Sequence, residues 1–138
     1  MVSELPGDDE AALREAVFRH MFGKNASGQQ ENAGVFCLAF EKDADPPAAF
    51  LARFRDLKIP VRPSSGCTRS ASKGVVDRAT GARGLAFRID SVLLKGADHA
   101  EVEGGYYEAG LSASGNLYTL ARKDGRWGVT KDQMRWIS

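Results

Sequence analysis

The clearest pattern of apolar and polar positions lies in the C-terminal part of the chain, from about Leu85 to Ile137. Apolar residues alternate with polar ones there, as they do in strands that bury one face. The alternation changes phase near Ser91, which predicts a β-bulge. Asp124-Gly125 separates the last two runs, and both residues tolerate a positive φ. The sequence therefore predicts an antiparallel β-meander that closes with a tight hairpin at this pair.

The position of this turn also sets which residues face one another across the last two strands. One face is predicted to be bulky and the other to carry small residues. Small residues inside a sheet often mark the close approach of a helix or the floor of a cavity, so this asymmetry is a candidate pocket signal. The expected pairs are Arg122–Trp127, Leu120–Val129 and Tyr118–Lys131 on the bulky face, and Ala121–Gly128 and Thr119–Thr130 on the other.

The N-terminal half predicts two helices and an interior strand. Apolar residues recur at helical spacing between Asp8-Asp9 and Gly23, which predicts a helix over about 9–22. The run Val35 to Phe40 is apolar on both faces and predicts a strand inside the sheet. Asp45-Pro46-Pro47 is typical of a helix start. A second amphipathic helix is marked by Phe50, Leu51, Phe54 and Leu57.

The remaining segments are predicted to be short or irregular. Ile59 to Pro63 is extended, but its two prolines restrict it to a sheet edge or a connector. Lys24 to Gly34 and Ser64 to Gly74 predict loops, Val75 to Asp77 predicts a short strand, and Leu111 to Asn116 is expected to connect two strands. The whole chain of 138 residues is therefore expected to form one α+β domain, with two helices from the N-terminal half packed on a curved, mostly antiparallel sheet.

The distribution of charge changes this picture only locally. The net charge is +1, which gives no global reason to expect nucleic acid or an anionic membrane as a partner. Residues 1–50 carry four basic and nine acidic side chains, whereas residues 51–90 carry nine and three. We expect these two segments to be neighbours or solvated faces. The alternative is an anion-binding surface formed by Arg53, Arg55, Lys58, Arg62, Arg69 and Lys73.

The two cysteines, Cys37 and Cys67, are too few for a disulfide-rich scaffold and lack the close spacing of redox and zinc pairs. Both are therefore expected to be reduced, with Cys37 acting as a small apolar residue. The acidic N-terminus lacks the apolar core of a signal peptide, and no stretch is long enough to cross a bilayer. A cytoplasmic location without membrane contact is the resulting expectation.

One group of candidate ligand-binding residues lies on a single predicted strand. His99, Glu101 and Glu103 share one side of it, and a histidine with two carboxylates can bind a metal or transfer protons. Alternating charges opposite an apolar stripe are also typical of a solvated sheet face, and this is the interpretation we favour. No metal and no cofactor are predicted.

Aromatic residues form the other group of candidates. Tyr106, Tyr107 and Tyr118 carry hydroxyl groups into apolar surroundings and could orient a small ligand. His20 lies on the apolar face of the first helix, where we expect a core histidine bonded to backbone. Trp127 opposite Arg122 is expected to form a cation–π pair that supports the hairpin.

The order helix, strand, helix and bent meander, ending in Lys123-Asp124-Gly125-Arg126-Trp127-Gly128-Val129, resembles the nuclear-transport-factor-2-like, or cystatin-like, α+β roll. The stretch from Glu103-Gly104-Gly105-Tyr106-Tyr107 through Trp136-Ile137-Ser138 is similar to small bacterial proteins with no assigned activity. The resemblance implies a curved sheet around a cone-shaped cavity, often in a dimer formed through the sheet. Isomerases of this superfamily use an aspartate base that faces a tyrosine and a second acid, but none of these positions is matched here, so the catalytic residues are unknown.

Two functions from different classes follow from these patterns. The first is a non-enzymatic roll that binds a small apolar ligand or a partner, as a homodimer through its sheet face. The second is a cofactor-independent isomerase, dehydratase or hydrolase that uses a carboxylate and a tyrosine inside the cavity. Fold alone does not select between them, because the same fold carries unrelated functions.

Overall fold

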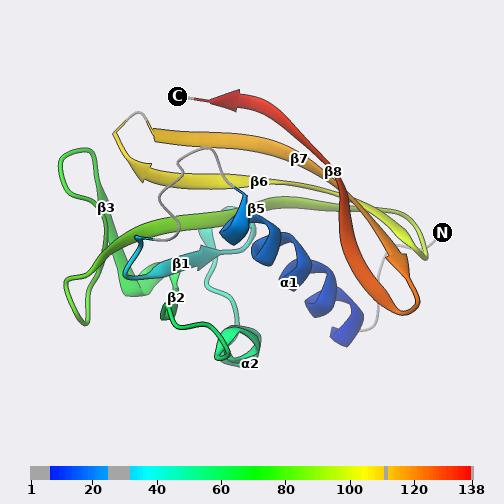
Figure 1. Cartoon of the computed structure of the whole chain (residues 1–138), viewed down its shortest axis with the longest axis horizontal. Helices are drawn as coiled ribbons and strands as arrows, with labels where there is room; N and C mark the ends of the chain where they lie inside the picture. The colour runs from blue at the N-terminus through cyan, green and yellow to red at the C-terminus, as the bar shows by residue number, and fades with distance from the viewer. Residues whose placement is uncertain (1–6, 25–31, 111, 138) are drawn as a thin grey trace.

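The computed structural model describes residues 7–24, 32–110 and 112–137, and it has the predicted α+β architecture. One long helix lies against the inner face of a strongly twisted sheet, and a short helix lies near its parallel edge (Figure 1). The helices are α1 (Gly7–Gly23) and α2 (Ala48–Leu51), with the 3₁₀ turns η1 (Glu41–Asp43), η2 (Ala52–Phe54) and η3 (Ser64–Gly66). The strands are β1 (Phe36–Ala39), β2 (Val61–Pro63), β3 (Cys67–Ser70), β4 (Gly74–Asp77), β5 (Arg83–Gly96), β6 (His99–Ala109), β7 (Ser112–Lys123) and β8 (Arg126–Ile137).

The strands of the main sheet follow the order β2-β1-β5-β6-β7-β8. The antiparallel meander β5 to β8 is the one predicted, and a register shift between Ile89 and Ser91 confirms its bulge. The hairpin at Asp124-Gly125 is also confirmed, since both residues have positive φ angles of 55° and 78°. β1 runs parallel to both of its neighbours, β2 and β5, which the sequence did not indicate.

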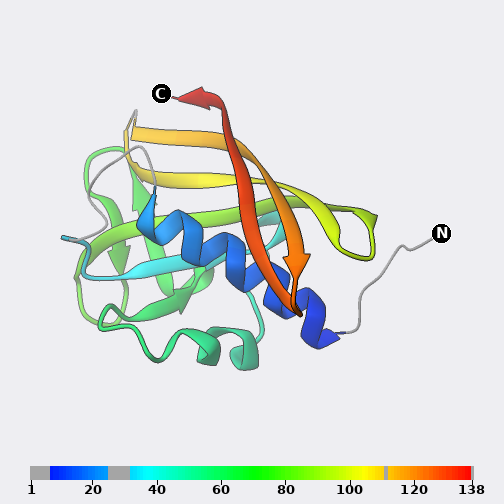
Figure 2. The same ribbon diagram turned by 45° about the vertical axis from the view of Figure 1, so that its right-hand side comes forward.

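The two edges of the main sheet differ in length and chemistry. β2 is a three-residue edge strand, as expected from Pro60 and Pro63, which have no amide hydrogen to donate. β8 at the opposite edge has 12 residues without proline and pairs with β7. Figure 2 shows β8 crossing over α1, so this long edge strand also forms part of the wall above the helix.

A cluster of aromatic rings fixes α1 on the sheet. Phe18 and Phe22 on the helix lie within ring-contact distance of phenylalanines from β1, α2, η2 and β5. Phe18 is fully buried, and its ring centroid lies 5.9 Å from that of Phe50. All seven phenylalanines of the chain take part in these contacts, namely Phe18, Phe22, Phe36, Phe40, Phe50, Phe54 and Phe87. None of the described helices is long and apolar enough to span a bilayer.

The second helix is shorter than the sequence predicts. α2 forms one turn, and the 3₁₀ turn η2 follows directly, so the helical segment ends at Phe54. Phe50 and Phe54 are still buried, as the amphipathic pattern requires. The apolar pattern therefore predicted the buried face correctly and the length of the helix incorrectly.

The expectation of reduced cysteines is wrong, and so is the prediction of a loop from Ser64 to Gly74. Cys37 in β1 and Cys67 in β3 form a disulfide with a Cα–Cα distance of 6.5 Å. β3 pairs with β4, and β4 pairs with β5, so this hairpin covers the outer face of the sheet behind β1. β1 is apolar on both faces because α1 covers one face and the β3–β4 hairpin covers the other.

Two other expected connections have different outcomes. The segment from Leu111 to Asn116 is not a connection, since β7 begins at Ser112; Leu111 itself lies outside the described residues. The predicted loop from Lys24 to Gly34 falls largely on residues 25–31, which also lie outside them.

A bulge changes the predicted register of the closing hairpin. Arg122 faces Trp127, with a cation–π distance of 5.3 Å, and Leu120 faces Val129, as expected. Thr130 is then an extra residue, so Thr119 faces Lys131 and Tyr118 faces Asp132 instead of the predicted partners. A one-residue slip moves each later side chain to the other face of the strand.

The small-residue face of this hairpin covers neither a helix nor a cavity. Gly128 and Thr130 are exposed, and Ala121 and Thr119 are partly exposed. A methyl group added at Gly128 would meet nothing within 4 Å. The small residues therefore face outward, and the cavity lies on the bulky face.

Candidate functional site

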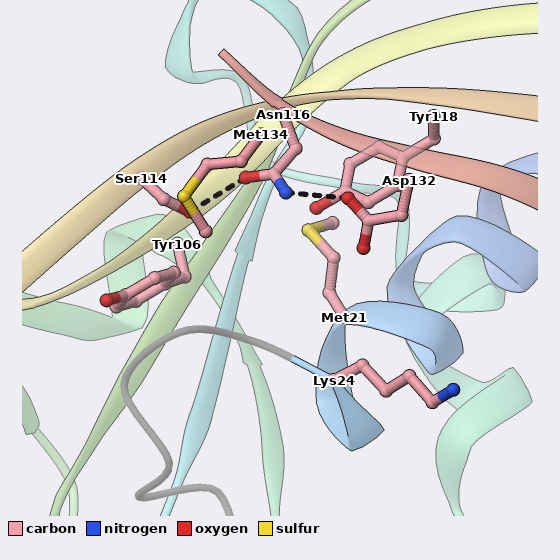
Figure 3. A pocket seen from close by; sticks show the side chains of 8 residues that line it. All are labelled: Met21, Lys24, Tyr106, Ser114, Asn116, Tyr118, Asp132 and Met134. Atoms are coloured by element: carbon pink, nitrogen blue, oxygen red, sulfur yellow. Dashed lines mark hydrogen bonds between the residues drawn. The ribbon is translucent and has the colours of Figure 1, made fainter. Parts of the chain in front are cut away.

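A cavity of about 300 Å³ lies between the C-terminal end of α1 and the inner face of β6, β7 and β8. Figure 3 shows polar groups from the strands facing the thioether of Met21 on the helix. This volume is at the low end for small-molecule sites in proteins. The lining residues are Met21, Lys24, Tyr106, Ser114, Asn116, Tyr118, Asp132 and Met134.

The first of two bulges in β8 determines which of its side chains enter the cavity. The extra residue Thr130 places Asp132 opposite Tyr118, and Met134 lies opposite Asn116. A second register shift follows between Gly115 and Asn116. Without the first bulge, the alternation of the strand would have aimed Lys131 at the cavity in place of the carboxylate.

A chain of hydrogen bonds holds the carboxylate of Asp132. The Asn116 amide donates to Asp132 Oδ1 at 2.7 Å, and Ser114 Oγ donates to Asn116 Oδ1 at 2.9 Å (Figure 3). His20 Nε2 on α1 lies 2.8 Å from Asp132 Oδ2. Both carboxylate oxygens therefore have a partner, and the side chain of Asp132 is 26 % exposed. This network joins the helix to two strands and fixes the orientation of its polar groups.

Tyr118 forms the deeper wall beside this network. It is 2 % exposed, and its ring makes an edge-to-face contact with His20 at a centroid distance of 5.6 Å. Burial raises the pKa of the Tyr118 phenol above its usual value, and the nearby Asp132 carboxylate raises this pKa further. The phenol consequently stays protonated at neutral pH and can donate a hydrogen bond.

The structure divides the predicted candidate residues between the two faces of the sheet. Tyr106 and Tyr118 line the cavity, and both are buried. Tyr107 points to the outer face, packs against the cluster around the disulfide and donates to the Ser70 carbonyl at 3.4 Å. Tyrosines adjacent in sequence therefore serve different faces, as the alternation of a strand requires.

His99, Glu101 and Glu103 also lie on the outer face, away from the cavity. His99 and Glu103 are exposed, Glu101 pairs with Lys95 at 3.5 Å, and Ser91 donates to Glu103 at 3.4 Å. Within residues 7–24, 32–110 and 112–137, no group of three or more acidic, histidine or cysteine side chains could hold a metal ion. These three residues therefore have the geometry of a solvated sheet face.

Carboxylates partly neutralise the basic segment of residues 51–90. Arg53 pairs with Glu15, Arg62 with Asp77, and Arg69 with Asp43. Half of the six cations proposed as an anion-binding surface are therefore engaged with carboxylates. Two of these carboxylates, Glu15 and Asp43, belong to the acidic segment, which favours the expectation that the acidic and basic segments are neighbours.

A second, larger hollow of about 550 Å³ lies between α1 and α2, beside Phe40 and Phe50. Its arginines are already engaged. Arg14 binds Glu10 and Glu41 and lies 4.4 Å from the centre of the Phe40 ring. Because its two arginines are paired with carboxylates within the fold, this hollow offers fewer groups to orient a ligand than the cavity beside Tyr118.

Sequence reasoning did not find Ser114, Asn116 and Asp132, and it assigned His20 to the core. His20 does lie on the buried side of α1, but its ring nitrogen contacts a carboxylate instead of backbone. The sequence carries a weak signal for Asn116 and Tyr118, which are two residues apart on one strand and so share a face. Nothing in it indicated the bulge that brings Asp132 to them.

Comparisons with protein-family models, curated proteins and solved structures give no match for this chain. The resemblance to the nuclear-transport-factor-2-like roll thus stays a prediction, and function must be argued from the cavity.

Proposed function

We propose that this chain is a small-ligand-binding protein whose ligand occupies the cavity between α1 and strands β6 to β8. The observation that carries the proposal is the fixed network Ser114–Asn116–Asp132–His20 beside the buried phenol of Tyr118. Ligand sites in proteins combine apolar walls with a few oriented polar groups. Here Met21 and Met134 supply the apolar walls.

The polar groups indicate the chemistry of the ligand. Tyr118 is a hydrogen-bond donor, whereas the carboxylate oxygens of Asp132 are acceptors that already have partners. A compact molecule with one carbonyl or hydroxyl oxygen would accept from the phenol, and its carbon skeleton would contact the thioethers. Cyclic ketones and alcohols have this combination.

Titration with cyclohexanone or cyclohexanol, followed by protein NMR, tests the proposal. We expect chemical-shift changes at Tyr106, Asn116 and Tyr118, and a dissociation constant that rises about two- to tenfold in Tyr118→Phe because one hydrogen bond is lost. The matched control is Glu103→Gln on the outer face, which should leave binding unchanged. Chemical-shift changes spread over both faces of the sheet would exclude this cavity as the site. Equal dissociation constants for Tyr118→Phe and Glu103→Gln would exclude it as well.

A second candidate function is proton transfer without a cofactor, as in an isomerase, dehydratase or hydrolase. It is favoured by the contact between His20 and Asp132 at 2.8 Å, with a tyrosine ring beside them. A histidine and a carboxylate in this arrangement can move a proton, and positioned acids and bases accelerate reactions about 100- to 10,000-fold. A bound compound that is recovered unchanged after long incubation with the protein would favour the binding function.

We also propose that the chain forms a homodimer through the outer face of the sheet. Leu93 and Trp136 are 53 % and 49 % exposed on that face, and large exposed apolar side chains often mark interaction surfaces. Light scattering should then give the mass of a dimer, and Glu103→Arg should shift it toward the monomer. Arg55→Glu, on the helical side, serves as the control. A monomeric mass for the unmodified protein would refute the dimer.

A further inference from the structure

The disulfide between Cys37 and Cys67 joins β1 to the hairpin that covers its outer face. Cys37 lies in an interior strand of the main sheet, and Cys67 begins β3, which belongs to the hairpin on the outer face. The two residues are 30 positions apart in the sequence. The bond therefore adds a covalent link between β1 and β3, which share no strand pairing, to a hairpin that is otherwise tied to the main sheet through the pairing of β4 with β5.

Both cysteines are closed off from solvent in the folded chain. Cys37 is 2 % exposed and Cys67 is 7 % exposed, among Val35, Val75 and Ala86. Tyr107 packs over the same cluster, and its hydroxyl donates to the Ser70 carbonyl on β3. Because thiol–disulfide exchange requires a thiolate to reach a sulfur atom, neither a reductant nor an oxidant can act on the bond while the hairpin is closed.

The surroundings also distinguish this bond from a catalytic or switching disulfide. Reactive cysteines are accessible and have a cationic neighbour or a second thiol close in sequence. Apolar side chains surround the bond, and the cation nearest to it in register, Arg62 opposite Cys37, is paired with Asp77 opposite Cys67 at 3.2 Å. The chain contains no cysteine beyond these two. The bond thus has the features of a structural disulfide.

We propose that the bond is installed during folding by a disulfide-donating protein, and that the chain consequently matures in an oxidising compartment. One cysteine thiolate attacks the donor's disulfide and forms a mixed disulfide. The thiolate of the second cysteine then displaces the donor, which leaves as a dithiol. The chain loses two electrons and two protons in total, and the donor disulfide gains them. Because both sulfur atoms are buried afterwards, this exchange precedes closure of the β3–β4 hairpin.

An oxidising compartment takes the place of the cytoplasmic location that was expected from the sequence. Structural disulfides persist in oxidising compartments, whereas cytosolic thiols are kept reduced. The proposal depends on the placement of the two cysteines alone, so it stands or falls independently of the ligand-binding function.

Thiol trapping in cells that naturally make the chain tests it. The cells are quenched in acid to stop exchange, the protein is denatured, and free thiols are labelled with a maleimide-linked polymer before gel analysis. We expect no mass shift without prior reduction and addition of two polymers after reduction. Two additions before reduction would show that the chain is reduced in its own compartment, and one addition would show that the cysteines do not pair with each other; either result overturns the proposal.

A second measurement checks whether the chain needs an oxidising compartment to reach its folded state. The chain is expressed in a bacterial host either in the cytoplasm or directed to the oxidising periplasm, with Cys37→Ala/Cys67→Ala as a control that cannot oxidise. We expect the periplasmic yield of folded protein to exceed the cytoplasmic yield, and the control to show no such gain. Equal yields, or an equal gain in the control, would contradict the need for an oxidising compartment.

Discussion

Replacing Phe18 with alanine is expected to lower the free energy of unfolding by about 3–5 kcal/mol, the usual range for removing a buried aromatic side chain. The Phe18 side chain is fully buried, and its ring contacts those of Phe22, Phe40, Phe50 and Phe54. Its removal would leave a cavity where α1, α2 and the end of β1 meet. Urea denaturation followed by circular dichroism measures the effect.

The control for this prediction is Phe18→Leu, which keeps most of the apolar volume and should lose clearly less stability than the alanine variant. Since the ring cluster also positions the C-terminal end of α1, the alanine variant should weaken binding in the cavity at temperatures where it is still folded. A loss below about 1 kcal/mol, small for a core truncation, would show that the helix is held by other contacts.

The double variant Cys37→Ala/Cys67→Ala is expected to lower the free energy of unfolding by about 3–4 kcal/mol. The bond closes a loop defined by a sequence separation of 30 residues, and the chain-entropy model assigns a contribution of this size to such a loop. Denaturant titrations of the oxidised protein and the double variant, without reductant, measure the difference.

Reduced wild-type protein is the matched comparison, because it keeps both side chains and lacks only the bond. Its denaturation midpoint should approach that of the double variant. Trypsin should also cut the reduced protein and the double variant faster than it cuts the oxidised protein, at Arg69 and Lys73, because the β3–β4 hairpin would open locally. An identical midpoint for the oxidised and reduced chains would mean that the bond adds no constraint.

The parts of the fold that could be predicted are those with local sequence causes. Asp124-Gly125 specifies its hairpin through the backbone freedom of two adjacent residues, and the apolar spacing around Val17 specifies α1. Pro60 and Pro63 correctly placed β2 at an edge. Each of these features depends on residues that lie close to one another in the sequence.

The parts that could not be predicted depend on distant partners. β3 has three exposed residues out of four and shows no apolar alternation; its strand form comes from pairing with β4. The parallel pairing of Phe36 with Leu85 and the bond between Cys37 and Cys67 likewise join segments far apart in sequence. The preference of single residues for helix or strand carries no information about such long-range contacts.

The candidate site illustrates the same limit on a smaller scale. Tyr106 and Tyr118 were predicted because aromatic residues with hydroxyl groups stand out in an apolar pattern, and both line the cavity. Asp132 was missed because a single extra residue, Thr130, reverses the facing of the strand beyond it. With that bulge known, counting from the hairpin would have placed the carboxylate opposite Tyr118.

The two edges of the main sheet differ in their capacity to pair with an additional strand. Pro60 and Pro63 leave the β2 edge too short and too poor in amide donors to template another strand. β8 presents 12 residues without proline, so it has both the length and the donors to do so. Any extension of this sheet, whether by a functional partner or by misassembly, should therefore start at the edge that also carries Asp132.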